Sequence, residues 1–255
     1  MQTLPIDSVV SDILEQLQQD NRLVIMAPPG AGKSTRLPLA LLESSVSKSG
    51  QIWMLEPRRL AAEQVARRLA HGLGESLGDT IGLITGDMSK TSVNNKLVVM
   101  TEGILTQRLI QENDISQCAM VIFDEFHERN LPTDLGLALT LQSQAYLRED
   151  LKILVMSATL DVETLCEKLD APLIKSEGRS FPINLQYRPI TSYQSQGFRS
   201  LELAVAQTIR HAIQQHEGDI LVFLPGVKEI NYVAQQIVDL HPDYLILPLH
   251  GQLHS

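Results

Sequence analysis

The chain has 255 residues, 44% of them hydrophobic and 20% charged, which suits a soluble α/β protein of one large or two modest domains. Its net charge of −9 argues against a protein that wraps non-specifically on nucleic acid, but it leaves room for a local basic groove. The sequence has no signal-peptide pattern, no apolar run of membrane-spanning length and only two cysteines, Cys118 and Cys166, without metal-ligand spacing. We therefore expect a reduced compartment, a cytoplasmic location and no membrane partner.

Predicted strands and helices alternate along the chain from its start to about residue 178. A helix is predicted over 4–19, with Asp7 or Ser8 as its cap, and a buried strand follows over 22–26. A strong helix is predicted over 58–71. Further apolar runs indicate strands at 51–55, 81–84, 97–100, 119–123 and 152–156. This rhythm predicts a parallel sheet with helices on both faces and with its ligand-binding edge at the carboxyl ends of the strands.

A second alternation of strands and helices begins near residue 180, after a segment that resembles a linker. Its predicted elements are strands at 183–188, 219–224 and 244–249 and helices at 201–215 and 228–240. The alternation stops at Ser255, before a complete doubly wound sheet is built. We therefore expect two domains, one over residues 1–178 and an incomplete second one over 179–255.

Residues 27–35 lie between a predicted strand and a predicted helix, an order that is typical of a phosphate-binding P-loop. Gly30 and Gly32 allow backbone conformations in which successive N–H groups point at phosphate oxygens, and a helix expected to start near Lys33 adds its positive end. Lys33 can reach the β- and γ-phosphates, and the Ser34 hydroxyl can ligate Mg²⁺. Ala27 stands in place of the usual first glycine. The residues expected to hold the nucleotide are Ala27, Pro28, Pro29, Gly30, Ala31, Gly32, Lys33, Ser34 and Thr35.

A second group of polar residues follows the predicted strand at 119–123. Asp124 would hold the hydration shell of Mg²⁺ beside Ser34, and Glu125 would orient the attacking water and take its proton. Taken alone, the segment could be a solvated turn whose carboxylates cap a helix, but the P-loop upstream favours the catalytic interpretation. His127 is either a further catalytic residue or an imidazole on a helix surface.

Taken together, these segments resemble the DEAH-box helicase family. The segments similar to its motifs I, Ia, Ib, II, III and IV are, in that order, residues 27–34, 56–62, 101–105, 124–127, 157–159 and 220–226. The sequence departs from the family at Phe126, where alanine is usual, and this variant is similar to one bacterial branch. The resemblance implies a RecA-like P-loop NTPase lobe over 1–178 and the start of a second RecA-like lobe over 179–255, with ATP and Mg²⁺ between them.

The resemblance also implies a single strand of nucleic acid across the top of the two lobes, RNA in preference to DNA. Arg58, Thr101 and Gly103 would contact its phosphate backbone. Such contacts are sequence-independent and salt-sensitive, and they do not by themselves distinguish RNA from DNA. Ser157 and Thr159 would couple the nucleotide state to movement, although as residues they could simply close a strand end through hydroxyl hydrogen bonds.

We expect an ATP-dependent helicase that hydrolyses ATP between its lobes to move along single-stranded RNA. The family's arginine-rich motif, which completes the ATP site, would lie beyond Ser255, so these residues are expected to bind nucleotide but to turn it over slowly. Two other classes stay open: a nucleotide-switched RNA-binding module without unwinding, and a small-molecule P-loop kinase. The kinase is less favoured because Glu125 supplies a water-activating acid and no arginine-rich lid is evident. Protein partners are not predicted.

Overall fold

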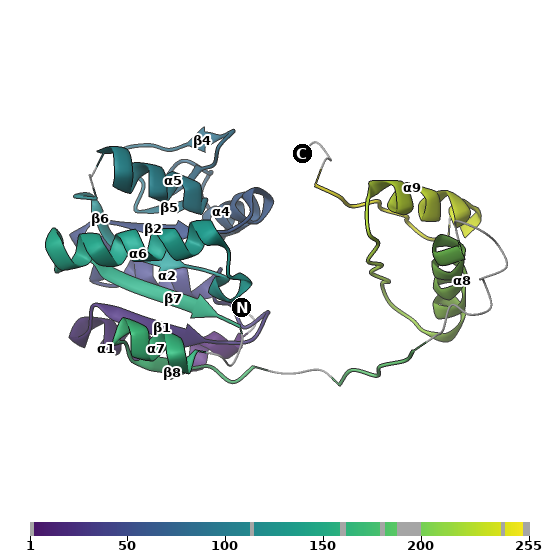
Figure 1. Cartoon of the computed structure of the whole chain (residues 1–255), viewed down its shortest axis with the longest axis horizontal. Coiled ribbons are helices and arrows are strands. Elements are labelled where there is room, and N and C mark those ends of the chain that lie inside the picture. Colours follow the sequence, from purple (N-terminus) through teal and green to yellow (C-terminus); the bar gives the residue numbers. More distant parts are fainter. Residues whose placement is uncertain are drawn as a thin grey trace. The chain divides into compact units, whose positions relative to one another are not determined.

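The computed structural model describes residues 3–112, 115–158, 162–178, 182–187, 200–240 and 243–251. The chain divides into two compact units, Met1–Phe181 and Pro182–Ser255. The first unit is a sheet with helices packed against it, whereas the described part of the second unit is built on two α-helices (Figure 1). Within the described ranges, no helix combines the length and the apolar character that a membrane span requires.

In the first unit, the described residues form an eight-stranded sheet with the order β4-β3-β5-β2-β6-β7-β1-β8. Neighbouring strands pair in parallel, except that β3 and β4 pair antiparallel. The parallel sheet predicted from the sequence is confirmed, and β4 and β8 add short strands that the apolar pattern does not predict. The strands are β1 (Arg22–Met26), β2 (Gln51–Leu55), β3 (Ile81–Ile84), β4 (Ser89–Lys90), β5 (Leu97–Met100), β6 (Cys118–Phe123), β7 (Lys152–Ser157) and β8 (Leu173–Lys175).

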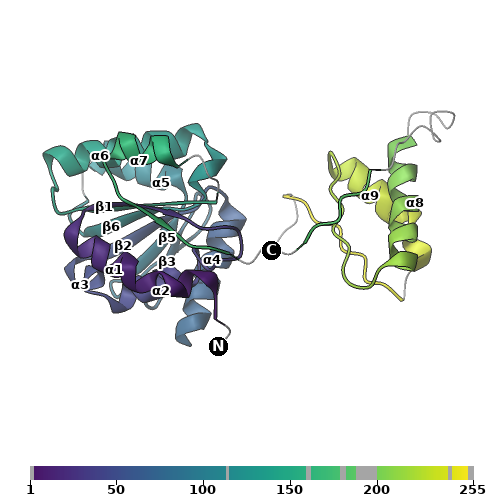
Figure 2. The same ribbon diagram turned by 90° about the horizontal axis from the view of Figure 1, so that it is seen from below.

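Helices cover both faces of this sheet (Figure 2). One face carries α1 (Val10–Gln19), α2 (Arg36–Glu43), α3 (Val46–Ser49) and α4 (Arg59–Leu73). The opposite face carries α5 (Glu102–Gln107), the π-helix η2 (Arg108–Glu112), α6 (Leu131–Tyr146) and α7 (Glu163–Leu169). A parallel sheet needs this cover because its strands bury apolar side chains on both sides, and every residue of β6 is buried.

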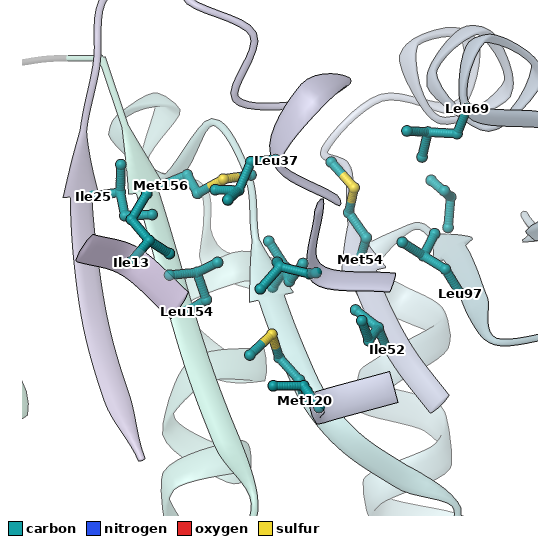
Figure 3. Close-up of a cluster of buried hydrophobic side chains, with 14 of the residues drawn as sticks. Ile13, Ile25, Leu37, Ile52, Met54, Leu69, Leu97, Met120, Leu154 and Met156 are labelled. Carbon is teal, nitrogen blue, oxygen red and sulfur yellow. The ribbon is translucent and has the colours of Figure 1, made fainter. Parts of the chain in front are cut away.

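The sheet separates two layers of apolar core. Figure 3 shows the layer under α1–α4, where Leu154 and Met156 of β7 lie with Ile13 and Leu37 from the helices. The other layer takes the intervening strand residues, such as Phe123 of β6. Because successive strand residues point to opposite faces, one apolar strand contributes to both layers, and this explains why the buried strands are visible in the sequence as apolar runs.

Two helix boundaries differ from the prediction. The segment predicted as one helix over 4–19 begins as a 3-10 turn, η1 (Pro5–Ser8), in which Asp7 Oδ2 accepts the Leu4 N–H at 3.0 Å, and only then continues as α1. The helix after the P-loop starts at Arg36 instead of near Lys33, because residues 33–35 form a turn that closes on the carbonyl of Gly32.

The second unit contains α8 (Ser200–Gln215), α9 (Val227–Gln236) and a 3-10 turn, η5 (Val238–Leu240). The strands predicted at 219–224 and 244–249 are wrong for this structure, in which neither segment pairs, and the described residues 182–187 of the strand predicted at 183–188 do not pair either. Val222 and Leu224 still pack on the helices while Leu221 and Phe223 are exposed, so the strand-like alternation is present. A strand forms only when a neighbour completes its backbone hydrogen bonds, and sequence alternation alone does not supply one.

Candidate nucleotide-binding site

The loop between β1 and α2 has the backbone that a P-loop requires. Gly30 and Gly32 have φ values of +76° and +98°, which residues with a side chain rarely adopt. A Cβ at Gly32 would also lie 2.8 Å from Leu4 Cδ1 and 3.0 Å from Ile6 Cγ2, whereas nothing lies within 4 Å of a Cβ at Gly30. Within the loop Ala27, Ala31 and Lys33 are buried, Pro28, Gly32, Ser34 and Thr35 are half-buried, and Pro29 and Gly30 are exposed.

The Lys33 side chain folds back over the loop and is only 3% exposed. Its Nζ donates hydrogen bonds to the carbonyl oxygens of Ala27 at 2.6 Å and Pro28 at 3.2 Å. A buried ammonium group requires such partners, and here the loop itself supplies them. Anionic phosphate oxygens accept more strongly than neutral carbonyls, so this lysine can exchange its loop partners for the phosphates of a nucleotide.

The N-terminal turn η1 anchors the P-loop, a role that the sequence reading missed. The Ile6 N–H donates to Ala31 O at 3.0 Å, and the Asp7 carboxylate pairs with Arg36 at 2.8 Å. Ile6 is fully buried beside the loop. The hydrogen bond from Leu4 N–H and the charge of Arg36 lower the pKa of Asp7. The sequence carries no local signal for this role, because the contacts join η1 to a loop that the fold brings beside it.

Asp124 and Glu125 follow β6 at the carboxyl edge of the sheet. Asp124 is 2% exposed, its N–H donates to Leu55 O at 3.1 Å, and its Oδ1 accepts the Glu125 N–H at 2.8 Å. Glu125 has a φ of +49°, which turns the chain sharply from β6 into the short turn η3 (Phe126–Glu128). The chain therefore turns sharply between the two acids at the end of the strand.

The P-loop, the acidic segment that begins at Asp124 and the segment that begins at Ser157 lie at the ends of three neighbouring strands. Strand β7 lies between β6 and β1 in the sheet. The Ala27 N–H donates to Ser157 O at 3.0 Å, and the Ala158 N–H donates to His127 Nδ1 at 3.2 Å. The other ring nitrogen of His127, Nε2, lies 3.3 Å from Glu125 Oε2. The end of β7 thus contacts both the P-loop and the acidic turn. Thr159, predicted to act with Ser157, lies outside the described residues.

Burial and neighbouring acids raise the pKa of two carboxyl groups at this edge. For Glu125, burial is the largest cause and the charge of Asp124 the next, while Lys33 and His127 oppose them. For Glu56, which follows β2, burial and then Asp124 raise the pKa to about 9. A raised pKa lets Glu125 accept a proton more readily, as a general base must.

The site also fits a magnesium ion of the kind that accompanies nucleotides. Within the described ranges, no group of three or more His, Cys, Asp or Glu side chains could hold a metal by itself. Mg²⁺ commonly binds through one or two protein oxygens together with water and phosphates, so a complete protein cage is not required. Asp124 offers a buried carboxylate directly after β6, and half-buried Ser34 offers a hydroxyl in the turn before α2.

The residues predicted to contact nucleic acid follow β2 and β5, two neighbouring strands of the sheet. Arg58 precedes α4, is largely exposed and pairs with Glu128 Oε1 at 2.9 Å. Thr101 precedes α5 and is half-buried, and nothing lies within 4 Å of a Cβ built at exposed Gly103. The pair with Glu128 is not evident from the sequence, because the two residues lie far apart in it. It brings the basic helix start into contact with the acidic turn η3.

Three features define a RecA-like P-loop NTPase lobe. They are the order of the strands, the P-loop after β1, and the two acids after β6, which β7 separates from β1 in the sheet. The model of the DEAD/DEAH box helicase family matches residues 8–167. The chain therefore belongs to the DEAD/DEAH box helicase family.

Relatives and solved structures agree with this assignment. The chain is 44% identical over 255 residues to the ATP-dependent RNA helicase HrpB of Escherichia coli K12, covering 99% of this chain and 31% of that protein. It is 34% identical over 254 residues to HrpA of the same organism, covering 99% and 20%. A crystal structure of the E. coli DEAH/RHA helicase HrpB matches with a TM-score of 0.86 and 44% identity over 92% of this chain and 30% of that one. The chain thus spans less than a third of these relatives.

Alanine substitutions at Gly30 and Gly32 distinguish the cost of backbone strain from the cost of a steric clash. We expect Gly30→Ala to lower the free energy of unfolding by about 1–2 kcal/mol, because only its left-handed backbone opposes a side chain. Gly32→Ala should cost about 2–4 kcal/mol, because its methyl group also collides with Leu4 and Ile6. Denaturant unfolding of both variants measures the difference, and equal losses would show that η1 does not pack on the loop as described.

Proposed function

We propose that the chain is the ATP-binding and ATP-hydrolysing lobe of an RNA helicase, residues 1–178, with the beginning of a second lobe in residues 179–255. The observation that carries this proposal is a continuous series of contacts between the predicted nucleotide and RNA sites. The series runs from Ala27 through Ser157, Ala158, His127 and Glu128 to Arg58. Coupling between the site that changes its ligand and the site that holds the strand can be carried by a series of contacts of this kind.

The hydrolytic chemistry follows from the roles of four residues. Lys33 binds the β- and γ-phosphates, while Ser34 and Asp124 hold Mg²⁺, which when bound neutralises phosphate charge. The oxygen of a water molecule forms a bond to the γ-phosphorus, the bond from that phosphorus to the leaving oxygen of ADP breaks, and the proton of the water passes to Glu125. The raised pKa of Glu125 supports its role as proton acceptor. The Nε2 atom of His127, which lies 3.3 Å from Glu125 Oε2, keeps the Glu125 carboxylate oriented.

Single-stranded RNA is the proposed partner because HrpB and HrpA are named ATP-dependent RNA helicases. Arg58, Thr101 and Gly103 offer a guanidinium group, a hydroxyl group and an open backbone for phosphates. In this structure Glu128 Oε1 accepts a hydrogen bond from one guanidinium nitrogen of Arg58, so a phosphate bound there would compete with that carboxylate. Binding of RNA would then release η3, which also carries His127.

We also propose that these 255 residues turn ATP over slowly. P-loop NTPases often complete the site with an arginine that contributes about 10³–10⁵-fold in turnover, and none of the motifs found in this sequence is the family's arginine-rich one. A nucleotide-switched RNA-binding module would use the same binding residues without needing Glu125 as a base. The two functions therefore differ in what they require of Glu125.

Glu125→Gln tests the hydrolytic role. The variant should bind a fluorescent ATP analogue with Mg²⁺ as tightly as the original chain, because the amide keeps the shape of the side chain. Its single-turnover hydrolysis should fall by about 10²–10⁴-fold, because the amide cannot accept the proton. Lys33→Ala should lose nucleotide binding instead. Unchanged hydrolysis in Glu125→Gln, with or without RNA, would favour the switch module over the helicase.

A pair of substitutions at the start of α4 tests the RNA site in both directions. Arg58→Ala should weaken binding of a single-stranded RNA oligonucleotide. The slope of log binding constant against log salt concentration should become shallower by about 1, the amount expected for one lost phosphate contact. Glu128→Gln should strengthen binding several-fold, because it removes the carboxylate that competes for Arg58. Arg67→Ala is the matched control, since Arg67 pairs with Glu63 on an exposed face of the same helix. Equal effects of Arg58→Ala and Arg67→Ala in titrations by fluorescence anisotropy would contradict the assignment of Arg58.

A further inference from the structure

Glu102 is a buried acid between two residues that the proposed function offers to RNA. It follows Thr101, which is half-buried, and precedes Gly103, which is exposed, yet Glu102 itself is only 4% exposed. Glutamate is mostly exposed in proteins and is almost never fully buried unless it is paired. The protein therefore buries a carboxylate at the place where the negatively charged backbone of RNA is expected to bind.

The partner of Glu102 is Thr133, in the first turn of α6. Helices α5 and α6 pack side by side on one face of the sheet (Figure 2), so a Cβ at Gly136 would lie 3.6 Å from Leu105 Cδ2. Thr133 is 3% exposed, and its Oγ1 lies 2.8 Å from Glu102 Oε1 and 2.8 Å from Asn130 Oδ1. A hydroxyl group has one proton, and a charged acceptor forms the stronger hydrogen bond. The Thr133 hydroxyl therefore donates to Glu102, while Asn130 Oδ1 accepts the Thr133 N–H at 2.8 Å as the cap of α6.

We propose that Thr133 is a positioning residue for RNA binding, which holds the Glu102 carboxylate inside the protein and away from the phosphates of a bound strand. The inference rests on the proposed contacts of RNA with Thr101 and Gly103. A carboxylate and a phosphate repel each other, and in physiological salt this repulsion acts over about 8 Å. A carboxylate that lost its buried donor would regain hydrogen bonds by turning to solvent, beside the strand. The Thr133 hydroxyl thus keeps the RNA site free of a negative charge that the chain itself carries.

Thr140 supplies a matched control on the same helix. It lies about two turns after Thr133 and is fully buried, and its Oγ1 donates to Gly136 O of its own helix at 2.7 Å. Thr133→Val and Thr140→Val therefore remove the same group from similarly buried positions. Thr133→Val deprives Glu102 of its donor, whereas Thr140→Val leaves the contact between α5 and α6 intact.

Fluorescence anisotropy titrations of the intact chain with a single-stranded RNA oligonucleotide test the proposal. We expect Thr133→Val to bind about 5–10-fold more weakly than the original chain at low salt, and the difference to shrink as salt screens the repulsion. Thr133→Ser keeps the hydroxyl and should bind normally, as should Thr140→Val. The double variant Thr133→Val with Glu102→Gln should regain the original affinity, because the amide carries no charge.

The outcomes separate this proposal from the function on which it rests. Equal RNA affinities of Thr133→Val and Thr140→Val would overturn the proposal. A double variant that stays as weak as Thr133→Val would also overturn it, because the Thr133 hydroxyl would then be structural only. Unchanged RNA affinity in Thr101→Ala would remove the RNA site itself, and the proposal with it. Should Thr133→Val unfold, as thermal denaturation would show, Thr133→Ala replaces it, because alanine also lacks the hydroxyl and favours a helix.

Discussion

Parallel pairing of β6, β7 and β1 is the constraint on which the whole site depends. It places the carboxyl ends of three strands on one edge, and the hydrogen bond from Ala27 N–H to Ser157 O continues the pairing into the P-loop. The first residue of the loop is therefore held in a fixed position at the carboxyl edge of the sheet. The buried residues of β7 hold this arrangement from both faces, so that the position of the phosphate-binding loop follows from the packing of the core.

Among the described residues, three non-glycine residues have left-handed backbones, and two of them lie where the proposed chemistry takes place. Glu125 and Arg129, on either side of η3, both have left-handed backbones although they carry side chains. Such conformations cost on the order of 1–3 kcal/mol each and persist only where the surroundings enforce them. Here the contacts of His127 with Ala158 and of Glu128 with Arg58 hold the turn. A turn held under strain by two exchangeable contacts is suited to a second arrangement when a ligand replaces one of them.

Much of this site could be predicted from the sequence because its parts are local. A strand, a glycine-rich turn and a helix are adjacent in the chain, and so are the apolar run of β6 and the acids that follow it. Parallel pairing then brings these local parts to one edge without further information. The sheet prediction is confirmed for the same reason. The roles of Lys33, Glu125 and Arg58 stay predictions.

What the sequence did not predict depends on contacts between distant segments. The anchoring of the loop by Ile6 and the pairing of Arg58 with Glu128 leave no local pattern, because each joins segments that only the fold brings together. Glu56 belongs to a recognised segment, yet its burial depends on how the fold packs around the end of β2. The strands expected in residues 182–255 were wrong because alternation predicts which side chains are buried, not whether a neighbouring strand is present.

The most direct test concerns the series of contacts from Ala27 to Arg58. It measures the coupling between nucleotide binding and RNA binding when the contact of His127 with Ala158 is removed. The affinity of the chain for a fluorescent ATP analogue would be measured with and without a saturating RNA oligonucleotide, for the original chain, for His127→Ala and for His71→Ala, an exposed histidine on α4. The contacts predict that RNA changes the nucleotide affinity about 5–150-fold in the original chain and in His71→Ala. In His127→Ala each ligand should still bind, but this factor should fall toward one. An undiminished factor in His127→Ala would contradict the connection through β7 and η3.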